Sequence, residues 1–245
     1  MFRILGKALL RIFSVLCLKA LEVVGCALEG IGRGFWFGVG LALGILFALA
    51  VVGKHAHAET VPHQAARFKA DLTRCARVHW GLEAPVATFA AQVHQESRWN
   101  PNAVSPVGAK GLTQFMPATS AWMGNVDPEL AANQPFNPGW ALRALSAYDK
   151  WLWDRVQAFT PCDRMAMTLS AYNGGLGWVQ RDKTLAHRQG ADPLEWFDSV
   201  ERFNAGRSAA AFRENRGYPR RILLTLEPLY VQAGWGLGVC HDDLR

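Results

Sequence analysis

A long uncharged apolar run divides this chain of 245 residues into two parts. It covers residues 35–53 and contains no Asp, Glu, Lys or Arg. A helix needs about 20 apolar residues to cross a bilayer, and the aromatic residues Phe35, Trp36 and Phe37 at the start of the run suit a membrane interface. We therefore predict a transmembrane helix, or signal anchor, at residues 35–53.

A cleaved leader is the alternative interpretation of this run, because Ala56-His57-Ala58 has the small-x-small pattern of a signal cleavage site. We favour an uncleaved anchor, since the leading region is long and the run exceeds the apolar core of an ordinary signal peptide. The basic residues before the run outnumber the acidic ones, which predicts a cytoplasmic N-terminus and an exported C-terminal part.

Residues 1–34 have the pattern of an amphipathic helix that associates with the membrane. Their charged residues fall on one side of a helical wheel, and most of the others are apolar. Such a helix suits the surface of the cytoplasmic leaflet, which is the role that we expect. The alternative is a helix that packs against a membrane partner with its charges turned inward.

Residues 54–66 are polar and predict a linker, and residues 67–245 predict one compact domain. Apolar residues recur there at three-to-four spacing and strand-like alternation is scarce, so the fold class is all-α, that is, mainly helical. We expect Asp163 to cap one of the helices. The expected helices cover about 67–80, 85–97, 111–123, 138–159, 163–172 and 218–233, with a long loop between the last two.

Charge and cysteine content exclude some classes of function. The net charge of +6 comes without a Lys/Arg stripe interleaved with aromatic residues, so we expect no nucleic-acid partner. No Cys/His spacing resembles a metal site, and we expect neither a metal nor another cofactor. The exported part holds Cys75, Cys162 and Cys240, which permit one disulfide and leave one cysteine over; the sequence does not assign the pair. Cys17 and Cys26 lie in the membrane-associated part.

Glu96 is the candidate for a catalytic acid. It lies three residues beyond Val93 and so continues the apolar stripe of its helix, where burial disfavours ionisation and raises the pKa of a carboxyl. The chain from Ser97 through Val126 contains no Asp or Glu. Because a glycosidase ordinarily uses two carboxylates, this arrangement suggests sugar cleavage in which one carboxyl plays both proton roles. The ordinary alternative is that Glu96 pairs with Arg98 or caps a helix.

Several short motifs, taken together and in order, resemble the signature of one enzyme family. They are Glu96-Ser97, the Ser105 spacing, Gly108-Ala109-x-Gly111-Leu112-x-Gln114-x-Met116-Pro117 and Ala171-Tyr172-Asn173. This set is similar to that of the lytic transglycosylases of the soluble-transglycosylase (SLT) type, which cut the glycan strands of peptidoglycan. The resemblance extends over about residues 67–232 and implies a lysozyme-like helical fold.

The resemblance implies a mechanism for Glu96. Protonated, it would donate to the β-1,4 glycosidic oxygen between N-acetylmuramic acid (MurNAc) and N-acetylglucosamine (GlcNAc). Ionised, it would remove the proton of the muramic C6 hydroxyl, which closes on C1 to leave a 1,6-anhydroMurNAc end without water. Two rivals remain open: a hydrolytic muramidase on the same fold, with Asp127 or Glu129 as the nearest second carboxylate, and a non-catalytic peptidoglycan-binding scaffold.

The resemblance also implies a set of substrate-binding residues. They are Ser105, Gln114, Met116, Tyr172, Asn173, Glu214 and Tyr218. Each has an ordinary alternative, such as a hydrogen bond within the loop for Ser105 or core packing for Tyr172. Glu214 has the alternative of pairing with Arg213 or Arg216.

Three residues depart from the family pattern around these positions. The closing motif usually reads Glu-Thr-x-x-Tyr-Val, where this chain has Asn215 and Pro219, and Gly174 stands where alanine is common. Outside the motifs, Trp99 and Trp122 are the tryptophans best placed to stack on sugar rings, whereas others lie on a core-patterned helix.

The resemblance and the charge pattern together predict location and partners. We expect a single-pass protein of the inner membrane with a periplasmic catalytic domain, acting on peptidoglycan glycan strands. Enzymes that resemble this one often serve envelope-spanning machines, so a conjugation, secretion or phage complex is the expected kind of partner. The sequence does not distinguish endo- from exo-cleavage.

Overall fold

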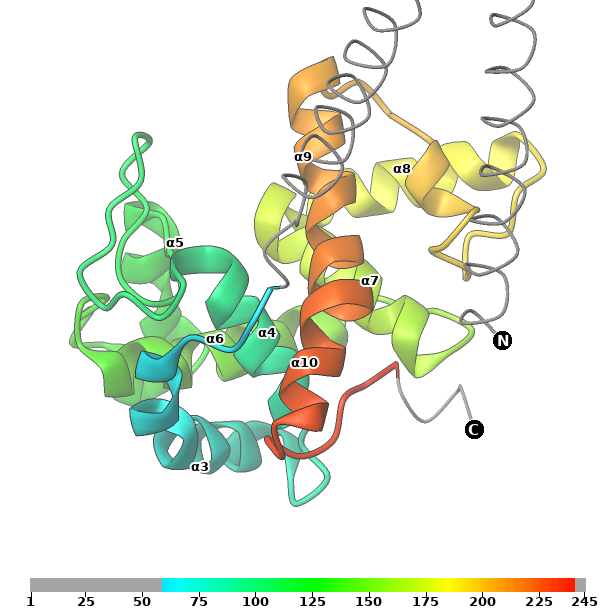
Figure 1. The fold of residues 1–245 in the computed structure, drawn as a ribbon. Helices are drawn as coiled ribbons and strands as arrows, with labels where there is room; N and C mark the ends of the chain where they lie inside the picture. Colours follow the sequence, from blue (N-terminus) through cyan, green and yellow to red (C-terminus); the bar gives the residue numbers. More distant parts are fainter. Residues whose placement is uncertain (1–58, 241–245) are drawn as a thin grey trace, which may run out of the picture. The chain divides into compact units, whose positions relative to one another are not determined.

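The computed structural model describes residues 59–240, and this part of the chain is built from helices and loops (Figure 1). The only strand-type pairings in it are isolated bridges between Val104 and Lys110 and between Lys110 and Phe115. The helical class predicted from the sequence is therefore confirmed. The helices are η1 (His63–Phe68), α3 (Lys69–Trp80), α4 (Val86–Ser97), α5 (Pro117–Trp122), η2 (Met123–Asn125), η3 (Pro128–Leu130), α6 (Pro138–Trp153), α7 (Pro161–Gly174), α8 (Leu176–Arg188), η4 (Val200–Arg202), α9 (Ala209–Arg220), η5 (Arg221–Leu226) and α10 (Glu227–Gln232).

One apolar core joins the helices of this domain. Phe89 of α4, Leu142 and Leu145 of α6, Met165 of α7 and Tyr230 of α10 are all fully buried in it. Helix α4 contacts both η5 and α10, so the segment that carries Glu96 packs against the C-terminal helices. This packing brings residues more than a hundred positions apart to one site.

The helices α9, η5 and α10 follow one another without a break and form a continuous rod, drawn in orange and red in Figure 1. We expected the last helix to begin near Tyr218, but it begins at Ala209, where the Ser208 hydroxyl accepts a hydrogen bond from the Ala211 N–H at 3.2 Å. Pro219 lies inside the rod and has no N–H to donate. The following segment, Arg221–Leu226, widens into a π-helix, the form in which a helix absorbs such a disruption.

The expected long loop after Gly174 was wrong, because helix α8 occupies its first part. Gly175, with φ +95°, makes the sharp turn between α7 and α8, and Gly177 then lies within the first turn of α8. The buried residues of α8 are only Val179, Asp182 and Ala186. The apolar pattern that would have revealed this helix is therefore interrupted by a charged residue.

Three further boundaries differ from those predicted. Helix α5 begins at Pro117 and not at residue 111, since Gly111 and Gln114 both have positive φ angles that a helix does not allow. Helix α6 ends at Trp153, because the chain must become extended before the next helix starts. That helix, α7, is capped by Thr160 rather than by Asp163.

Residues 59–66, which we expected to form a linker, pack onto the domain. His63–Phe68 form a short 3-10 helix in which Ala65 and Phe68 are buried. Within residues 59–240 no helix has the length and hydropathy to cross a membrane. The helices that we predicted at 1–34 and 35–53 lie outside the described residues.

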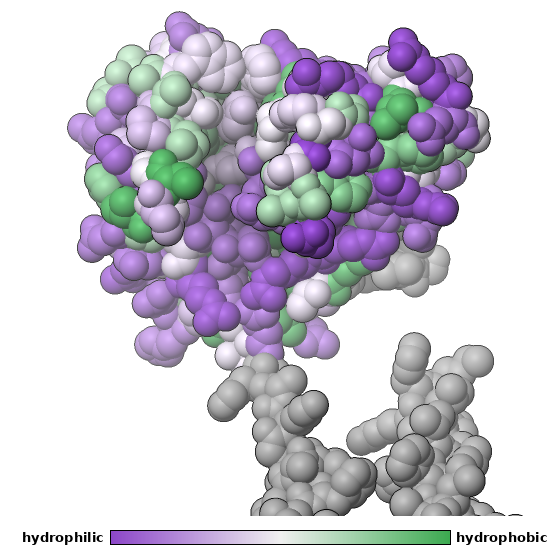
Figure 2. All heavy atoms as spheres, turned by 90° about the horizontal axis from the view of Figure 1, so that it is seen from above, coloured by the Kyte–Doolittle hydropathy of each residue, from purple (hydrophilic) through white to green (hydrophobic). Residues whose placement is uncertain are grey.

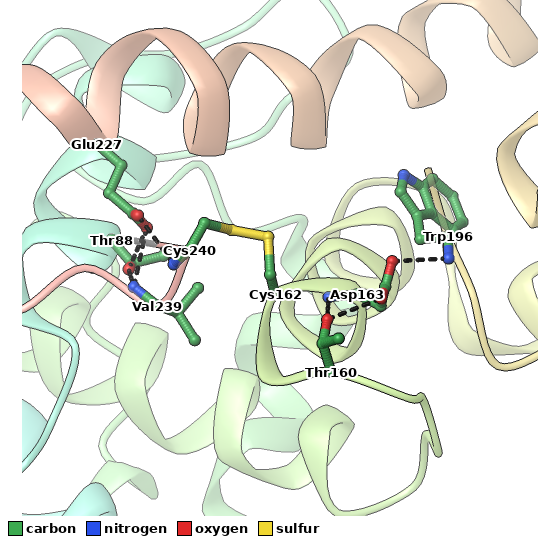
Figure 3. The surroundings of a disulfide bond; sticks show 8 residues. All are labelled: Thr88, Thr160, Cys162, Asp163, Trp196, Glu227, Val239 and Cys240. Atoms are coloured by element: carbon green, nitrogen blue, oxygen red, sulfur yellow. Dashed lines mark hydrogen bonds between the residues drawn. A yellow bond between two sulfur atoms is a disulfide. The ribbon is translucent and has the colours of Figure 1, made fainter. Parts of the chain in front are cut away.

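A disulfide joins Cys162, in the first turn of α7, to Cys240 at the end of the described chain (Figure 3). Cys75 keeps a free thiol. Beside the disulfide, the Glu227 carboxylate accepts hydrogen bonds from the N–H groups of Val239 and Cys240 and from the Thr88 hydroxyl. The C-terminal segment is thus held to α10 and α4 as well as to α7.

The surface seen in Figure 2 is mostly hydrophilic, with hydrophobic patches that remain separate from one another. The most exposed large apolar side chains come from different parts of the domain. They include Val78, Leu82, Val107, Phe159 and Leu224.

Candidate active site

Glu96 lies in the last turn of α4, which ends at Ser97 with Arg98 in the left-handed conformation (φ 52°, ψ 37°). Its half-buried side chain reaches a cleft. The pKa of Glu96 is raised to about 8: removal from water raises it most, a hydrogen bond from Tyr218 lowers it, and the nearby charge of Glu214 raises it. Glu96 therefore carries a proton at neutral pH.

The hydroxyl of Tyr218 donates a hydrogen bond to Glu96 Oε1. Tyr218 belongs to α9, so this bond connects α9 to the end of α4. A donor aimed at the carboxyl stabilises its ionised form. Tyr172 lines the same cavity as Glu96, and its own hydroxyl donates to the Thr113 carbonyl at 2.7 Å.

The cleft beside Glu96 has a volume of about 340 Å³. It brings together seven of the eight site residues expected from the sequence, which come from α4, α7, α9 and the loop before α5. These seven are Glu96, Ser105, Gln114, Met116, Tyr172, Asn173 and Glu214. The eighth, Tyr218, lines a second cavity of about 340 Å³ that also contains Glu96, Asn173 and Glu214. The two cavities thus share Glu96, Asn173 and Glu214 as lining residues.

The loop before α5 forms one wall of the cleft and is closed by its own hydrogen bonds. Ser105 Oγ accepts a hydrogen bond from the Ala109 N–H at 3.0 Å, so the loop role considered for Ser105 exists alongside its position in the cleft. Gln114 has a φ of 50°, and its Nε2 donates to the carbonyls of Ala103 and Gly111 at 3.2 and 2.9 Å. A Cβ at Gly111 would lie 1.9 Å from the Pro135 carbonyl oxygen, which only glycine avoids.

The other carboxylates considered from the sequence lie in different places. Asp127 and Glu129 both pair with Arg143, at 2.5 Å each, and do not line the cleft. Glu214 does line it, and makes no ion pair within residues 59–240. Its suggested partner Arg216 instead pairs with Asp182 at 2.7 Å.

Asp149 is a buried carboxyl near Glu96 that the sequence reasoning missed, because it lies on the core face of α6. Burial raises its pKa well above the ordinary value, and the charge of Glu96 raises it further. Its Oδ1 accepts a hydrogen bond from Gln92 at 3.4 Å, while Asp149 Oδ2 and Gln92 Oε1 have no donor. The raised pKa and the absence of a donor for Oδ2 both favour the neutral acid form of Asp149.

Asn215 and Gly174, two residues that depart from the family pattern, lie in contact near the cleft. Asn215 is buried, and its Nδ2 donates to the Ser170 carbonyl at 2.8 Å and to Asn173 Oδ1 at 3.0 Å. A Cβ at Gly174 would lie 2.7 Å from that same Nδ2. Glycine at position 174 therefore makes room for the amide at position 215.

The two tryptophans chosen as sugar platforms do not line the cleft. Trp99 is fully buried, stacks on Phe68 and donates from Nε1 to the Tyr230 hydroxyl at 2.6 Å, so that prediction was wrong. Trp122 packs edge-on against Trp151. Trp122 is half-buried, and its role in sugar stacking stays a prediction.

The fold and the site define a class of protein: a helical domain with one protonated carboxyl in a polar cleft, held by a tyrosine from another helix. Residues 76–194 match the family model described as "Transglycosylase SLT domain". Over these residues the chain therefore matches a transglycosylase domain of the SLT family.

The chain is similar to curated relatives over part of its length. A membrane-bound lytic murein transglycosylase F from Idiomarina loihiensis is 35% identical over 134 residues, which are 54% of this chain and 28% of the relative. The protein of the same name from Shewanella frigidimarina is 32% identical over 134 residues, 54% of this chain and 27% of the relative. The matched segment thus spans little more than a quarter of these relatives.

Solved structures of related enzymes were also matched. The 70 kDa soluble lytic transglycosylase SLT70 from Escherichia coli has 18% sequence identity and a TM-score of 0.48, covering 74% of this chain and 32% of that one. An inactive mutant of the lytic transglycosylase Slt from Pseudomonas aeruginosa has 24% sequence identity and a TM-score of 0.49, and the match covers 70% of this chain and 25% of that one.

Proposed function

We propose that this protein is a peptidoglycan lytic transglycosylase that cleaves the β-1,4 bond between MurNAc and GlcNAc and leaves 1,6-anhydroMurNAc ends. The observation that carries the proposal is the position of Glu96, which lines two cavities and accepts a hydrogen bond from Tyr218; burial there raises its pKa to about 8. A general acid for a reaction near neutral pH must hold its proton until the transition state.

Glu96 acts twice in the proposed reaction. Protonated, it donates to the glycosidic oxygen, and the C1–O bond to GlcNAc breaks. The resulting carboxylate then accepts the proton of the muramic C6 hydroxyl, whose oxygen bonds to C1. The enzyme ends as it began, with a protonated Glu96, and no water is consumed.

Tyr218 supports the charged half of this cycle. Its hydroxyl donates to Glu96 Oε1 and stabilises the carboxylate that forms after the first proton transfer. The remaining residues of the cleft bind the substrate: Ser105, Gln114, Met116, Tyr172, Asn173 and Glu214 are positioned to contact sugar rings and acetamido groups.

The proposal is tested by mass spectrometry of the products after the purified full-length protein digests peptidoglycan. Anhydro-ended muropeptides that are absent with Glu96→Gln would support it. Products heavier by one water would mean a hydrolase, for which Glu214 is the second carboxylate in the same cleft. A wild-type protein that binds glycan strands without cleaving them would mean a scaffold.

The proposed location is the periplasmic face of the inner membrane, held by residues 35–53. It is supported by the apolar run in the sequence and by the relatives' name, which describes them as membrane-bound. We further propose that residues 1–34 recruit the enzyme to an envelope-spanning conjugation, secretion or phage complex. Deleting residues 1–34 should abolish co-purification with such a complex, and unchanged recruitment would contradict this role.

A further inference from the structure

The first ten residues of the described domain, Glu59–Phe68, contact the end of α4, the helix that carries Glu96. We call this segment the N-terminal strap; in Figure 1 it is the cyan segment that crosses α4. Because the sequence alone suggested a linker here, the contacts of the strap need a separate explanation.

The Glu59 carboxylate is the charged end of the strap and is only 19% exposed. Its Oε1 accepts a hydrogen bond from Arg221 Nη2 at 2.7 Å and lies 3.4 Å from His94 Nε2. Arg98 Nη2 also approaches it, at 3.3 Å, from a more exposed side chain. One carboxylate therefore links His94 of α4 and Arg98, the residue just after α4, to Arg221, the first residue of η5.

The rest of the strap holds the backbone just after Glu96. Arg98 and Trp99 both have positive φ angles, 52° and 66°, in the left-handed region that side chains with a Cβ disfavour. Gln64 Nε2 donates to the Arg98 carbonyl at 2.6 Å, and the Phe68 ring stacks on Trp99 at a centroid distance of 5.8 Å. The strap thus stabilises the unusual ending of α4.

Arg221 connects the N-terminal strap to the cleft. While its Nη2 binds Glu59, its Nε donates to Gln95 Oε1 at 2.5 Å. Gln95 and Arg221 line the same cavity as Glu96 and Tyr218. The two elements that meet in the Glu96–Tyr218 hydrogen bond, α4 and the C-terminal rod, are therefore joined a second time through Glu59.

We propose that Glu59 is a positioning residue, which fixes α4 against the C-terminal rod so that the Tyr218 hydroxyl stays aimed at Glu96. This inference rests on the proposed function. Glu59 touches no reacting atom; it acts through Arg221 and the end of α4.

The charged and titratable groups around both carboxylates determine what the loss of Glu59 should do. Glu59 faces His94 of α4, Arg98 just after α4, and Arg221 of η5. Glu96 faces Tyr218 and Glu214 of α9, Tyr172 of α7 and Asp149 of α6. The hydrogen bond from Tyr218 lowers the pKa of Glu96, so loosening that bond raises it. Removing a negative charge would by itself lower the same pKa, so the two mechanisms shift it in opposite directions.

The test compares Glu59→Gln with the wild type in the full-length protein, using a soluble peptidoglycan oligomer and measuring kcat and KM across pH. Glu83→Gln is the matched control, because Glu83 is exposed and makes no hydrogen bond or ion pair within the described residues. For Glu59→Gln we expect kcat to fall about 10-fold with KM little changed. The alkaline limb of the kcat profile should move upward, Glu59→Asp should recover part of the loss, and Glu83→Gln should match the wild type.

A double variant separates positioning from general damage. If Glu59 acts through Tyr218, adding Glu59→Gln to Tyr218→Phe should lower kcat by less than Glu59→Gln does alone. Three results for Glu59→Gln would each overturn the proposal. They are an unchanged kcat, a downward shift of the alkaline limb, and a lower melting temperature with the wild-type pH profile. A wild-type protein that forms no anhydro products would overturn the proposed function itself, whereas an active wild type matched by Glu59→Gln would overturn only the role of Glu59.

Discussion

At the scale of single residues, the proton on Glu96 determines the behaviour of the site. Three effects set its pKa: burial and the charge of Glu214 raise it, and the hydrogen bond from Tyr218 lowers it. Glu214 and Tyr218 can each be changed to an isosteric residue without a titrating group.

The activity should therefore depend on pH with a limb near 8. Glu96 must start protonated, so kcat should be level below that pH and fall above it. Tyr218→Phe removes the donor that favours the carboxylate and should move the limb upward, whereas Glu214→Gln removes a repelling charge and should move it downward. Initial rates from pH 5 to 10 check both; shifts of the same sign would contradict this account of the pKa.

Glu96 should also destabilise the fold at neutral and alkaline pH. Its carboxyl has a pKa of about 8 in the folded protein against an ordinary value of 4.5, so the unfolded chain releases the proton first as the pH rises. The free energy of unfolding then falls between about pH 4.5 and 8, by up to about 5 kcal/mol. Glu96→Gln, which does not titrate, should be no more stable than the wild type at pH 4 and clearly more stable at pH 8.5. Denaturant unfolding at both values measures the difference, and equal stability at pH 8.5 would exclude a raised pKa.

At the scale of helices, the sequence predicts elements whose apolar spacing is regular and misses those stabilised by charge. The helices expected near 85–97 and 138–159 are both present, the second ending at Trp153, and both carry long buried apolar stripes. Helix α8 was missed because its buried face includes Asp182, which pairs with Arg207 and Arg216 from beyond the helix. A charge satisfied by distant arginines leaves no local pattern to detect.

The start of α7 shows what a single cap contributes to an element. The Thr160 hydroxyl accepts a hydrogen bond from the Asp163 N–H at 3.0 Å and donates to the Asp163 carboxylate, which in turn accepts from the Trp196 N–H at 2.9 Å (Figure 3). Thr160→Ala should lower the free energy of unfolding by about 1 kcal/mol, since the helix loses its N-cap.

Thr184→Ala is the control for this substitution. Thr184 is exposed within α8 and its hydroxyl donates to a carbonyl of its own helix, so alanine there should be neutral or slightly stabilising. Thermal unfolding of both variants measures the contrast. Equal losses would mean that the Thr160 hydroxyl has no capping role.

At the scale of the whole molecule, the local motifs of the site could be predicted and its long-range contacts could not. The loop motif places Ser105, Gln114 and Met116 on one wall because they are close in sequence. The Glu96–Tyr218 bond joins residues 122 positions apart, and the Glu59–Arg221 pair joins residues 162 positions apart. Such contacts depend on how α4 packs against the C-terminal rod, which spacing along the chain does not encode.

The disulfide joins two cysteines that are 78 positions apart in the sequence. Closing a loop of this length restricts the unfolded chain, and Cys162→Ser with Cys240→Ser should cost about 3–4 kcal/mol of stability. Cys75→Ser, which removes the free thiol, should cost much less. Reductant should lower the melting temperature of the wild type and of Cys75→Ser, and leave the double variant unchanged; a sensitive double variant would contradict this pairing.

The contact between Gly174 and Asn215 makes the two positions depend on one another. Alanine at position 174 would place its Cβ 2.7 Å from Asn215 Nδ2, so the amide of Asn215 would have to move. That amide donates to the Ser170 carbonyl and to Asn173 Oδ1, so moving it disturbs both hydrogen bonds. What position 174 tolerates is therefore decided by the residue at position 215, and the effects of substitutions at the two positions are not additive.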